Sequence, residues 1–469
     1  MTQDPSNPPA TIVDLLRHGT PSAEAIGAPG RPSLSYDALL RHVTATVGKL
    51  NALGIGRHDT AAIVLPNGPE MATAFVAFAA GTTTAPLNPA YTADEFRFYL
   101  RDLDARLLVV EAGSDSPARA VAGELGIPVA ILESDPDLPA GAFLLDGPAA
   151  TARTPGFAAA DDIALVLHTS GTTSRPKIVP LTQTNVSASA AAVSASLALL
   201  PGDRCLNIMP LFHIHGLIAA VLASLYAGSS VHCSPGFDAI RFFRWMNDIE
   251  PTWYTGVPTM HQAILARAAR NQATIDSVPL RLIRSSSASL PPSVMRELEQ
   301  TFGAPVIEAY GMTEAAHQMA SNPLPPSPRK PGSVGLPAGP DIAIMDESGA
   351  LLGDGEIGEI VIRGANVTKG YYKNPEATAE AIESDGWLHT GDLAARDGSG
   401  YYRITGRLRN MIIRGGQNIY PVEIEQFLLT HPGIEKVRVF GEADKRFGEI
   451  VAAEINLREN SSCTAEEII

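Results

Sequence analysis

The chain has 469 residues, of which 45% are hydrophobic and 18% are charged, and its formal net charge is −15. These proportions are typical of a soluble globular protein with a large core. The negative charge disfavours nucleic acid or an anionic membrane as a general partner, because both partners need a basic surface. A small anionic ligand held in a local basic pocket remains compatible with this negative net charge.

The cysteines and the N-terminal segment indicate a cytoplasmic protein. Cys205, Cys233 and Cys463 have no CxxC spacing, as expected for reduced thiols that pack in the interior. The first residues, MTQDPSNPPATIVDLL, have no basic stretch followed by an apolar core, so no signal peptide is predicted. The longest apolar stretches are shorter than the roughly 20 residues of a membrane span and are predicted to be buried helices.

Helical and strand patterns alternate through most of the chain. Helices are predicted over residues 35–54, 68–81 and 95–105, and strands over 59–67, 106–112 and 127–133. Further buried strands are predicted over 305–311 and around Ser285, with ends that open on a cleft. From about Asp341 onward, turn glycines and alternating apolar and polar residues predict a β-rich subdomain. Residues 420–457 predict a helix followed by two strands.

This alternation predicts an α/β protein with mainly parallel strands. We expect residues 1–405 to form a large, multi-lobed N-terminal domain, with two α/β sheet subdomains and the β-rich subdomain. Residues 406–469 are expected to contain a hinge and the first part of a small α+β C-terminal domain. Because a unit of about 60 residues struggles to bury enough surface, we expect this second domain to be truncated.

The stretch LHTSGTTSRPKIVPLTQTNV, which begins at Leu167, suggests a phosphate-binding loop between a strand and a helix start. A Walker loop needs glycine before its lysine and Ser or Thr after it, whereas Pro176 and Ile178 flank Lys177 here. The hydroxyl and backbone N–H groups of residues 169–173 can still surround phosphate oxygens, with Lys177 supplying positive charge. A Ser/Thr-rich surface turn is the alternative.

Three later segments carry groups suited to the rest of a nucleotide. Thr313 and Glu314 follow a predicted strand, where a hydroxyl beside a carboxylate suits a phosphate and its Mg²⁺. An ordinary helix N-terminus is the alternative for this pair. Asp392 is predicted in a tight turn as an acceptor for ribose hydroxyls. Arg407 and Arg409 lie beside a glycine-rich turn.

Together these segments resemble the adenylate-forming superfamily, which includes acyl-CoA synthetases, adenylation domains and firefly luciferase. The resemblance covers nearly the whole chain from about residue 30. It implies a two-step reaction in which a carboxylate attacks the α-phosphate of Mg·ATP, giving an acyl-adenylate and pyrophosphate. A thiol, usually that of coenzyme A, then displaces AMP.

The resemblance also implies roles for individual residues. The loop for the β- and γ-phosphates corresponds to Thr169, Ser170, Gly171, Thr172, Thr173 and Lys177. The adenine would lie against Ser286, Ser287, Ala288, Glu308, Ala309 and Tyr310, with Thr313 on the α-phosphate, Glu314 on Mg²⁺, and Asp392 and Arg407 on the ribose. Arg409 matches the hinge about which the small domain turns.

This sequence departs from the superfamily at two glycines of the loop, where it has Ser174 and Ile178. The superfamily's adenylating lysine lies in the second half of the small domain, beyond this sequence. We therefore expect this chain to bind nucleotide but to adenylate poorly, because that lysine stabilises negative charge during transfer.

The acid is predicted from four polar residues at positions that line the acyl pocket in the superfamily. These residues are His213, His215, Ser289 and His317. They offer hydrogen bonds to a second polar group on the substrate, which a fatty-acid tunnel would not need. The stretches LHTSGTTSRP, PLFHIHGL, EAYGMTEAAHQMASNPLPP and ANVTKGYYKNPEAT are most similar to the oxalate–CoA ligase branch, with oxalate clamped by His213, Ser289 and His317.

Several alternatives stay open. His213, which we count with Thr313 and Glu314 among the catalytic residues, could be a general gate of the superfamily, and His317 could face the core. The substrate could be another short, medium-chain or aromatic acid. The chain could also be an amino-acid-activating domain, a luciferase-like oxygenase, or a nucleotide-binding homologue without catalysis. We expect a monomer or homodimer that uses ATP, Mg²⁺ and coenzyme A.

Overall fold

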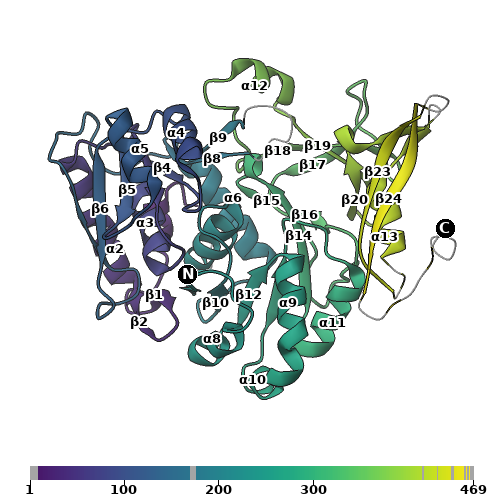
Figure 1. Ribbon diagram of the computed structural model, residues 1–469, viewed down its shortest axis with the longest axis horizontal. Coiled ribbons are helices and arrows are strands. Elements are labelled where there is room, and N and C mark those ends of the chain that lie inside the picture. The colour runs from purple at the N-terminus through teal and green to yellow at the C-terminus, as the bar shows by residue number, and fades with distance from the viewer. Residues whose placement is uncertain are drawn as a thin grey trace.

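The computed structural model describes residues 9–169, 176–414, 417–429, 431, 433–444, 448–458, 461 and 464. Within these residues the strands form four sheets, two large ones in the N-terminal part and two small ones that follow (Figure 1). The mixed α/β class predicted from the sequence is therefore confirmed. None of the helices in the described part combines the length and hydrophobicity needed to cross a membrane.

The first large sheet has parallel central strands, and β7 and β9 join its edges in antiparallel orientation. In sheet order its strands are β7 (Phe143–Asp146), β6 (Val129–Ser134), β5 (Leu107–Glu111), β3 (Thr60–Val64), β4 (Thr83–Pro86), β8 (Ile163–His168) and β9 (Ile178–Thr182). The helices of this part are α1 (Ile12–Leu16), α2 (Tyr36–Ala52), α3 (Pro69–Ala79), α4 (Ala93–Asp102) and α5 (Pro117–Leu125). The central strands β3, β4 and β5 are almost wholly buried, as expected for parallel strands covered on both faces.

The second large sheet contains the strands that end at the candidate site. In sheet order they are β16 (Leu336–Pro337), β15 (His317–Ser321), β14 (Val306–Met312), β13 (Leu282–Ser285), β12 (Trp253–Gly256), β10 (Arg204–Asn207), β11 (Ser230–Cys233), β1 (Glu24–Ala28) and β2 (Arg31–Ser35). Its helices are α6 (Gln183–Ser196), η1 (His215–Leu222), α7 (Ala223–Tyr226), α8 (Phe242–Ile249), α9 (Pro258–Ala268), η2 (Ala269–Asn271), α10 (Gln272–Ser277), α11 (Pro292–Phe302) and η3 (Thr313–Ala315).

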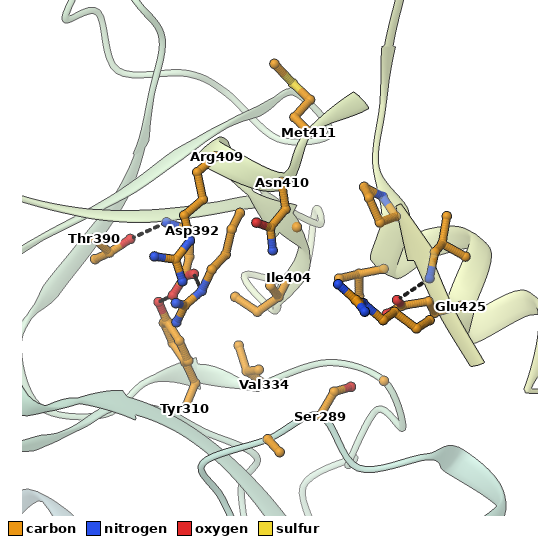
Figure 2. A pocket seen from close by; sticks show the side chains of 18 of the residues that line it. Ser289, Tyr310, Val334, Thr390, Asp392, Ile404, Arg409, Asn410, Met411 and Glu425 are labelled. Atoms are coloured by element: carbon orange, nitrogen blue, oxygen red, sulfur yellow. Dashed lines mark hydrogen bonds and ion pairs between the residues drawn. The ribbon is translucent and has the colours of Figure 1, made fainter. Parts of the chain in front are cut away.

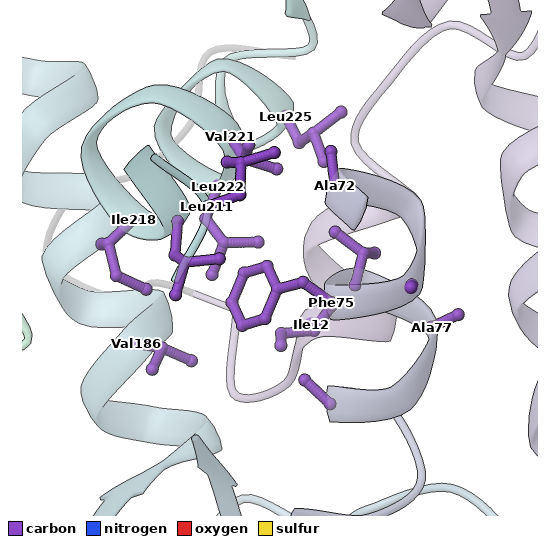
Figure 3. Close-up of a cluster of buried hydrophobic side chains, with 14 of the residues drawn as sticks. Ile12, Ala72, Phe75, Ala77, Val186, Leu211, Ile218, Val221, Leu222 and Leu225 are labelled. Carbon is purple, nitrogen blue, oxygen red and sulfur yellow. The ribbon is translucent and has the colours of Figure 1, made fainter. Parts of the chain in front are cut away.

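A shared hydrophobic core joins the two large sheets. Helix α3 contacts β8 of the first sheet and β1 and β11 of the second. Phe75 of α3 is fully buried and points toward Ile218 and Leu222 of η1 (Figure 3). Because burying a phenylalanine side chain contributes about 1.5–3 kcal/mol, such contacts fix the two sheets as one body.

The two small sheets follow in the C-terminal part. The first is β17 (Asp341–Met345), β18 (Ile357–Arg363), β19 (Leu388–Arg396) and β20 (Tyr402–Arg407), with α12 (Pro375–Ala381) before β19. The second is β22 (Gln417–Ile419), β21 (Ile412–Arg414), β24 (Gly448–Leu457) and β23 (Ile434–Asp444), with η4 (Leu408–Asn410) and α13 (Pro421–Leu428). The β-rich subdomain and the helix followed by two strands agree with the sequence analysis. A domain boundary at residue 405 stays a prediction.

The structure differs from the sequence analysis at three places. The loop after β8 leads into the antiparallel strand β9 before α6 begins; β9 tolerates Pro180 because it lies at the sheet edge. Asp392 lies inside β19 and not in a tight turn, next to Gly391 at φ +74° and an irregularity in the pairing with β20. One of the long apolar stretches predicted to be a buried helix, residues 217–228, lies in a helical segment that begins earlier, at His215, and its first part is π-helical, a feature frequent at functional sites.

Candidate active site

A cavity of about 640 Å³ lies where the second large sheet meets the C-terminal elements. Figure 2 shows its walls, with Ser289 and Tyr310 on one side and Glu425 of α13 on the other. Predicted nucleotide-binding residues on these walls are Ser287, Ala288, Glu308, Ala309, Tyr310, Asp392 and Arg407. Arg409, the predicted hinge residue, is exposed on η4 and also lines the cavity. We refer to this space as the central cavity.

Two hydrogen bonds hold the predicted adenine-binding segments together. The first segment follows β13, and the second belongs to β14, the parallel neighbour of β13. Ser286 Oγ donates to the carbonyl oxygen of Ala309 at 2.9 Å, and the N–H of Leu290 donates to Glu308 Oε1 at 2.9 Å. Glu308 is 2% exposed, and burial raises its pKa to about 7 despite the bond from Leu290. Ser287, which lies between Ser286 and Leu290 in the sequence, has a left-handed backbone conformation with φ +71°.

Asp392 is fixed by groups from two other strands. Its Oδ1 lies 2.8 Å from Arg407 Nε of β20, and its Oδ2 accepts a hydrogen bond from the Tyr310 hydroxyl of β14. Its N–H donates to Thr390 Oγ1 at 3.1 Å, which sets the backbone of β19 here (Figure 2). The carboxylate is thus held at the cavity wall in one orientation, as an acceptor suited to sugar hydroxyls.

Glu314 lies close to the lysine of the predicted phosphate loop. Glu314 is 7% exposed, and its Oε1 accepts a hydrogen bond from the Tyr371 hydroxyl at 3.0 Å. Lys177 Nζ lies 4.6 Å from the centroid of the same tyrosine ring. Burial raises the pKa of Glu314, opposed by the Tyr371 bond and by the charges of Lys177 and Arg407. Tyr371, which contacts both Glu314 and Lys177, was not predicted from the sequence.

The rest of the predicted phosphate loop is described only at its ends. The N–H of Thr169 donates to the carbonyl oxygen of Lys177 at 2.9 Å, which closes the base of the loop. Ser170, Gly171, Thr172 and Thr173 lie outside the described residues. Thr313 begins η3, one residue before Glu314 and directly after β14.

Two of the predicted acyl-pocket histidines form a buried cluster with Arg284. The rings of His215 and His317 stack with centroids 4.9 Å apart. Arg284 Nη1 lies 3.2 Å from His215 Nε2, and Arg284 Nη2 lies 3.0 Å from His317 Nε2. His215 Nδ1 lies 3.0 Å from Ser287 Oγ, so the cluster reaches the wall of the central cavity. Burial, together with the Arg284 charge, lowers the pKa of both histidines and keeps them neutral.

The other two predicted acyl-pocket residues are exposed, unlike this buried cluster. Ser289 is exposed on the cavity wall, and the described hydrogen bonds of the His215 ring join it to Ser287, Thr255 and Arg284 instead. His213 is exposed, and its Nδ1 accepts a hydrogen bond from the N–H of His215 at 3.3 Å. Arg284 was not predicted as a site residue. Its position inside a predicted buried strand could have indicated a role, because arginine is almost never fully buried unless it is paired.

Comparison with known proteins shows which family has this architecture. Residues 17–372 match the AMP-binding enzyme family. The oxalate–CoA ligase of Arabidopsis thaliana is 43% identical over 456 residues, covering 96% of this chain and 88% of the plant protein. The oxalate–CoA ligase of Saccharomyces cerevisiae is 38% identical, covering 88% of this chain and 80% of the yeast protein. A crystal structure of ATP-bound MatB from Rhodopseudomonas palustris, 30% identical, superposes with a TM-score of 0.87 over 98% of this chain and 91% of that one.

The fold and the cavity therefore define an enzyme class that binds an adenine nucleotide in a mixed α/β scaffold. The chain belongs to the AMP-binding enzyme family, within the adenylate-forming CoA ligase superfamily.

Proposed function

We propose that the protein is an ATP-dependent acid–CoA ligase that activates oxalate. One carboxylate of oxalate attacks the α-phosphate of ATP, forming an oxalyl-adenylate and releasing pyrophosphate. The thiol of coenzyme A then attacks the acyl carbon, forming oxalyl-CoA, and AMP leaves with the P–O bond intact. The relationship to oxalate–CoA ligases from a plant and a yeast supports this choice of acid.

The observation that carries the proposal is the position of Ser287. Its side chain lines the central cavity beside the residues proposed to hold adenosine, and its Oγ lies 3.0 Å from His215 Nδ1. Ser287 thus belongs both to the nucleotide wall and to the polar cluster of His215 and His317. An acid held against this cluster is adjacent to the nucleotide, as the first step requires.

The nucleotide is proposed to contact the cavity through two groups of residues. Ser287, Ala309 and Tyr310 provide the adenine wall, with Ser286 buried behind it, and Asp392 accepts hydrogen bonds from the ribose with Arg407 beside it. Thr313 is proposed to contact the α-phosphate, and Lys177 the outer phosphates.

Glu314 fits the role of a Mg²⁺ ligand. Among the described residues, no group of three or more His, Cys, Asp or Glu side chains is arranged to hold a metal by itself. Magnesium commonly keeps several waters and binds one or two carboxylates together with substrate phosphates, so a single carboxylate near Lys177 suits it. When bound, the ion neutralises phosphate charge. Glu314 holds its carboxylate in place through the bond from Tyr371.

The test is an acid panel with ATP and coenzyme A, in which AMP release and thioester formation are both measured. Oxalate should give the highest kcat/KM, above malonate, octanoate and coumarate. A strong preference for octanoate or coumarate would contradict the oxalate assignment. Pyrophosphate exchange on the same acids tests the adenylation step separately.

A further inference from the structure

Arg284 lies on β13 and is completely buried, with 0% of its surface exposed. An isolated charge in a protein interior is strongly unfavourable unless an opposite charge or a set of hydrogen bonds compensates it. In the part of the chain that the structure describes, no carboxylate forms an ion pair with Arg284, and its Nε has no hydrogen-bond partner. Burial lowers its pKa to about 9, which still leaves the guanidinium charged near neutral pH.

The groups around the guanidinium are neutral. Its contacts are His215, His317, Gln318 Oε1 at 2.9 Å and Thr255 Oγ1 at 3.5 Å. The Cys205 thiol acts on Arg284 electrostatically, but burial and the neighbouring Cys233 raise its pKa, so it stays protonated. The cluster therefore carries one net positive charge.

The hydrogen bonds of Arg284 also fix which imidazole nitrogens carry a proton. A guanidinium only donates, so His215 Nε2 and His317 Nε2 must accept. The Thr255 hydroxyl, 2.6 Å from His215 Nε2, donates to the same nitrogen. In each neutral ring the proton then lies on Nδ1. His215 Nδ1–H donates to Ser287 Oγ, which leaves the serine hydroxyl proton free to point into the central cavity.

We propose that Arg284 determines substrate specificity by supplying a buried positive charge that selects acids with a second anionic group. Arg284 acts through His215, His317 and Ser287 and does not itself touch the substrate. A second carboxylate on the substrate completes the charge balance of the cluster and accepts the hydrogen bonds that the cluster directs toward the cavity. An acid without that group leaves the charge uncompensated. This inference rests on the proposed acid–CoA ligase function and concerns the class of acid.

The test compares oxalate with oxamate, in which a neutral amide of nearly the same size replaces one carboxylate. The wild-type protein should prefer oxalate by about 100-fold in kcat/KM, as expected for a hydrogen bond to a charged group. In Arg284→Gln this preference should disappear, mainly through a higher KM for oxalate. In Arg284→Lys, which keeps the charge, oxalate should remain preferred by at least about tenfold. Calorimetric titration of both acids into protein saturated with AMP gives the same ratios wherever turnover is slow.

Several results would overturn the inference. These are equal use of oxamate and oxalate by the wild type, a parallel loss of both acids in Arg284→Gln, or loss of the preference in Arg284→Lys. If Arg284→Gln does not fold, the wild-type and Arg284→Lys ratios still decide. ATP affinity should stay within about twofold in both variants, because Arg284 has no described contact with the residues proposed to hold the nucleotide.

Failure of the oxalate assignment gives a different pattern. Wild-type protein would then favour another acid, and the pairs malonate with malonamate and succinate with succinamate test the charge rule independently. Preference for the diacid in such a pair supports the inference while rejecting oxalate. Preference for the monoamide rejects the inference.

Discussion

Replacing Tyr371 with phenylalanine separates the two contacts that this tyrosine makes. The variant loses the hydroxyl that donates to Glu314 Oε1 at 3.0 Å, but keeps the ring whose centroid lies 4.6 Å from Lys177 Nζ. The neighbouring Tyr372 has no described hydrogen bond to Glu314, so Tyr372→Phe is a matched control.

The magnitude follows from the burial of the acceptor. Glu314 is 7% exposed, so water replaces the lost donor poorly. A hydrogen bond to a charged group contributes about 1.5–3 kcal/mol, which corresponds to about 10- to 100-fold in an equilibrium constant. The bond favours the ionised carboxylate, so its loss raises the pKa of Glu314 further above the ordinary value that burial already shifts upward. A protonated carboxyl group cannot bind Mg²⁺.

The assay is pyrophosphate exchange as a function of free Mg²⁺ and of pH. Tyr371→Phe should need about 10- to 100-fold more Mg²⁺ for half-maximal rate, and the acid limb of its pH profile should lie at higher pH than in the wild type. Tyr372→Phe should match the wild type in both. The reasoning is refuted if Tyr371→Phe keeps the wild-type Mg²⁺ requirement and acid limb.

Two further predictions concern β19. Asp392→Asn removes the charge paired with Arg407 at 2.8 Å, and the Kd for ATP measured by calorimetry should rise about 10- to 100-fold. An unchanged Kd would contradict the ribose role of Asp392. Asp397→Asn, on the exposed turn after β19, is the control. His389 lies between Glu359 and Glu383 at 2.8 and 3.1 Å, and although burial lowers its pKa, the hydrogen bonds and charges of both carboxylates raise it overall. Its stabilising contribution is complete below the unfolded pKa of about 6.5 and is lost as the pH rises through the higher folded pKa. The difference in urea unfolding free energy between wild type and His389→Gln should therefore be larger at about pH 6 than at about pH 9, and the reverse order would disprove it.

Much of the scaffold could be predicted from the sequence because its signals are local. The mostly apolar run that forms β3 and the apolar run led by Pro69 that forms α3 each carry their own period and boundary. The convergence of residues near 286 and 310 followed from one topological rule, that neighbouring parallel strands end at the same edge of a sheet.

The parts that escaped prediction depend on contacts between distant segments. Tyr371 stands in a polar loop, and only the folded chain brings its hydroxyl to Glu314, 57 residues earlier in the sequence. The partners of Arg284 come from η1, β12 and β15. Periodicity describes which face of one element is buried and carries no information on what faces it across the fold.

The left-handed backbone of Ser287 limits how the thermal stability of this enzyme can be increased. At φ +71° a serine is strained, and glycine would relieve that strain at no steric cost. A search for thermostable variants would therefore favour Ser287→Gly, and this substitution removes the hydroxyl that links His215 Nδ1 to the cavity wall. Under the proposed role of Ser287, thermal stability and substrate selectivity make opposite demands on this position, and we expect screens for heat resistance alone to weaken the preference for the diacid.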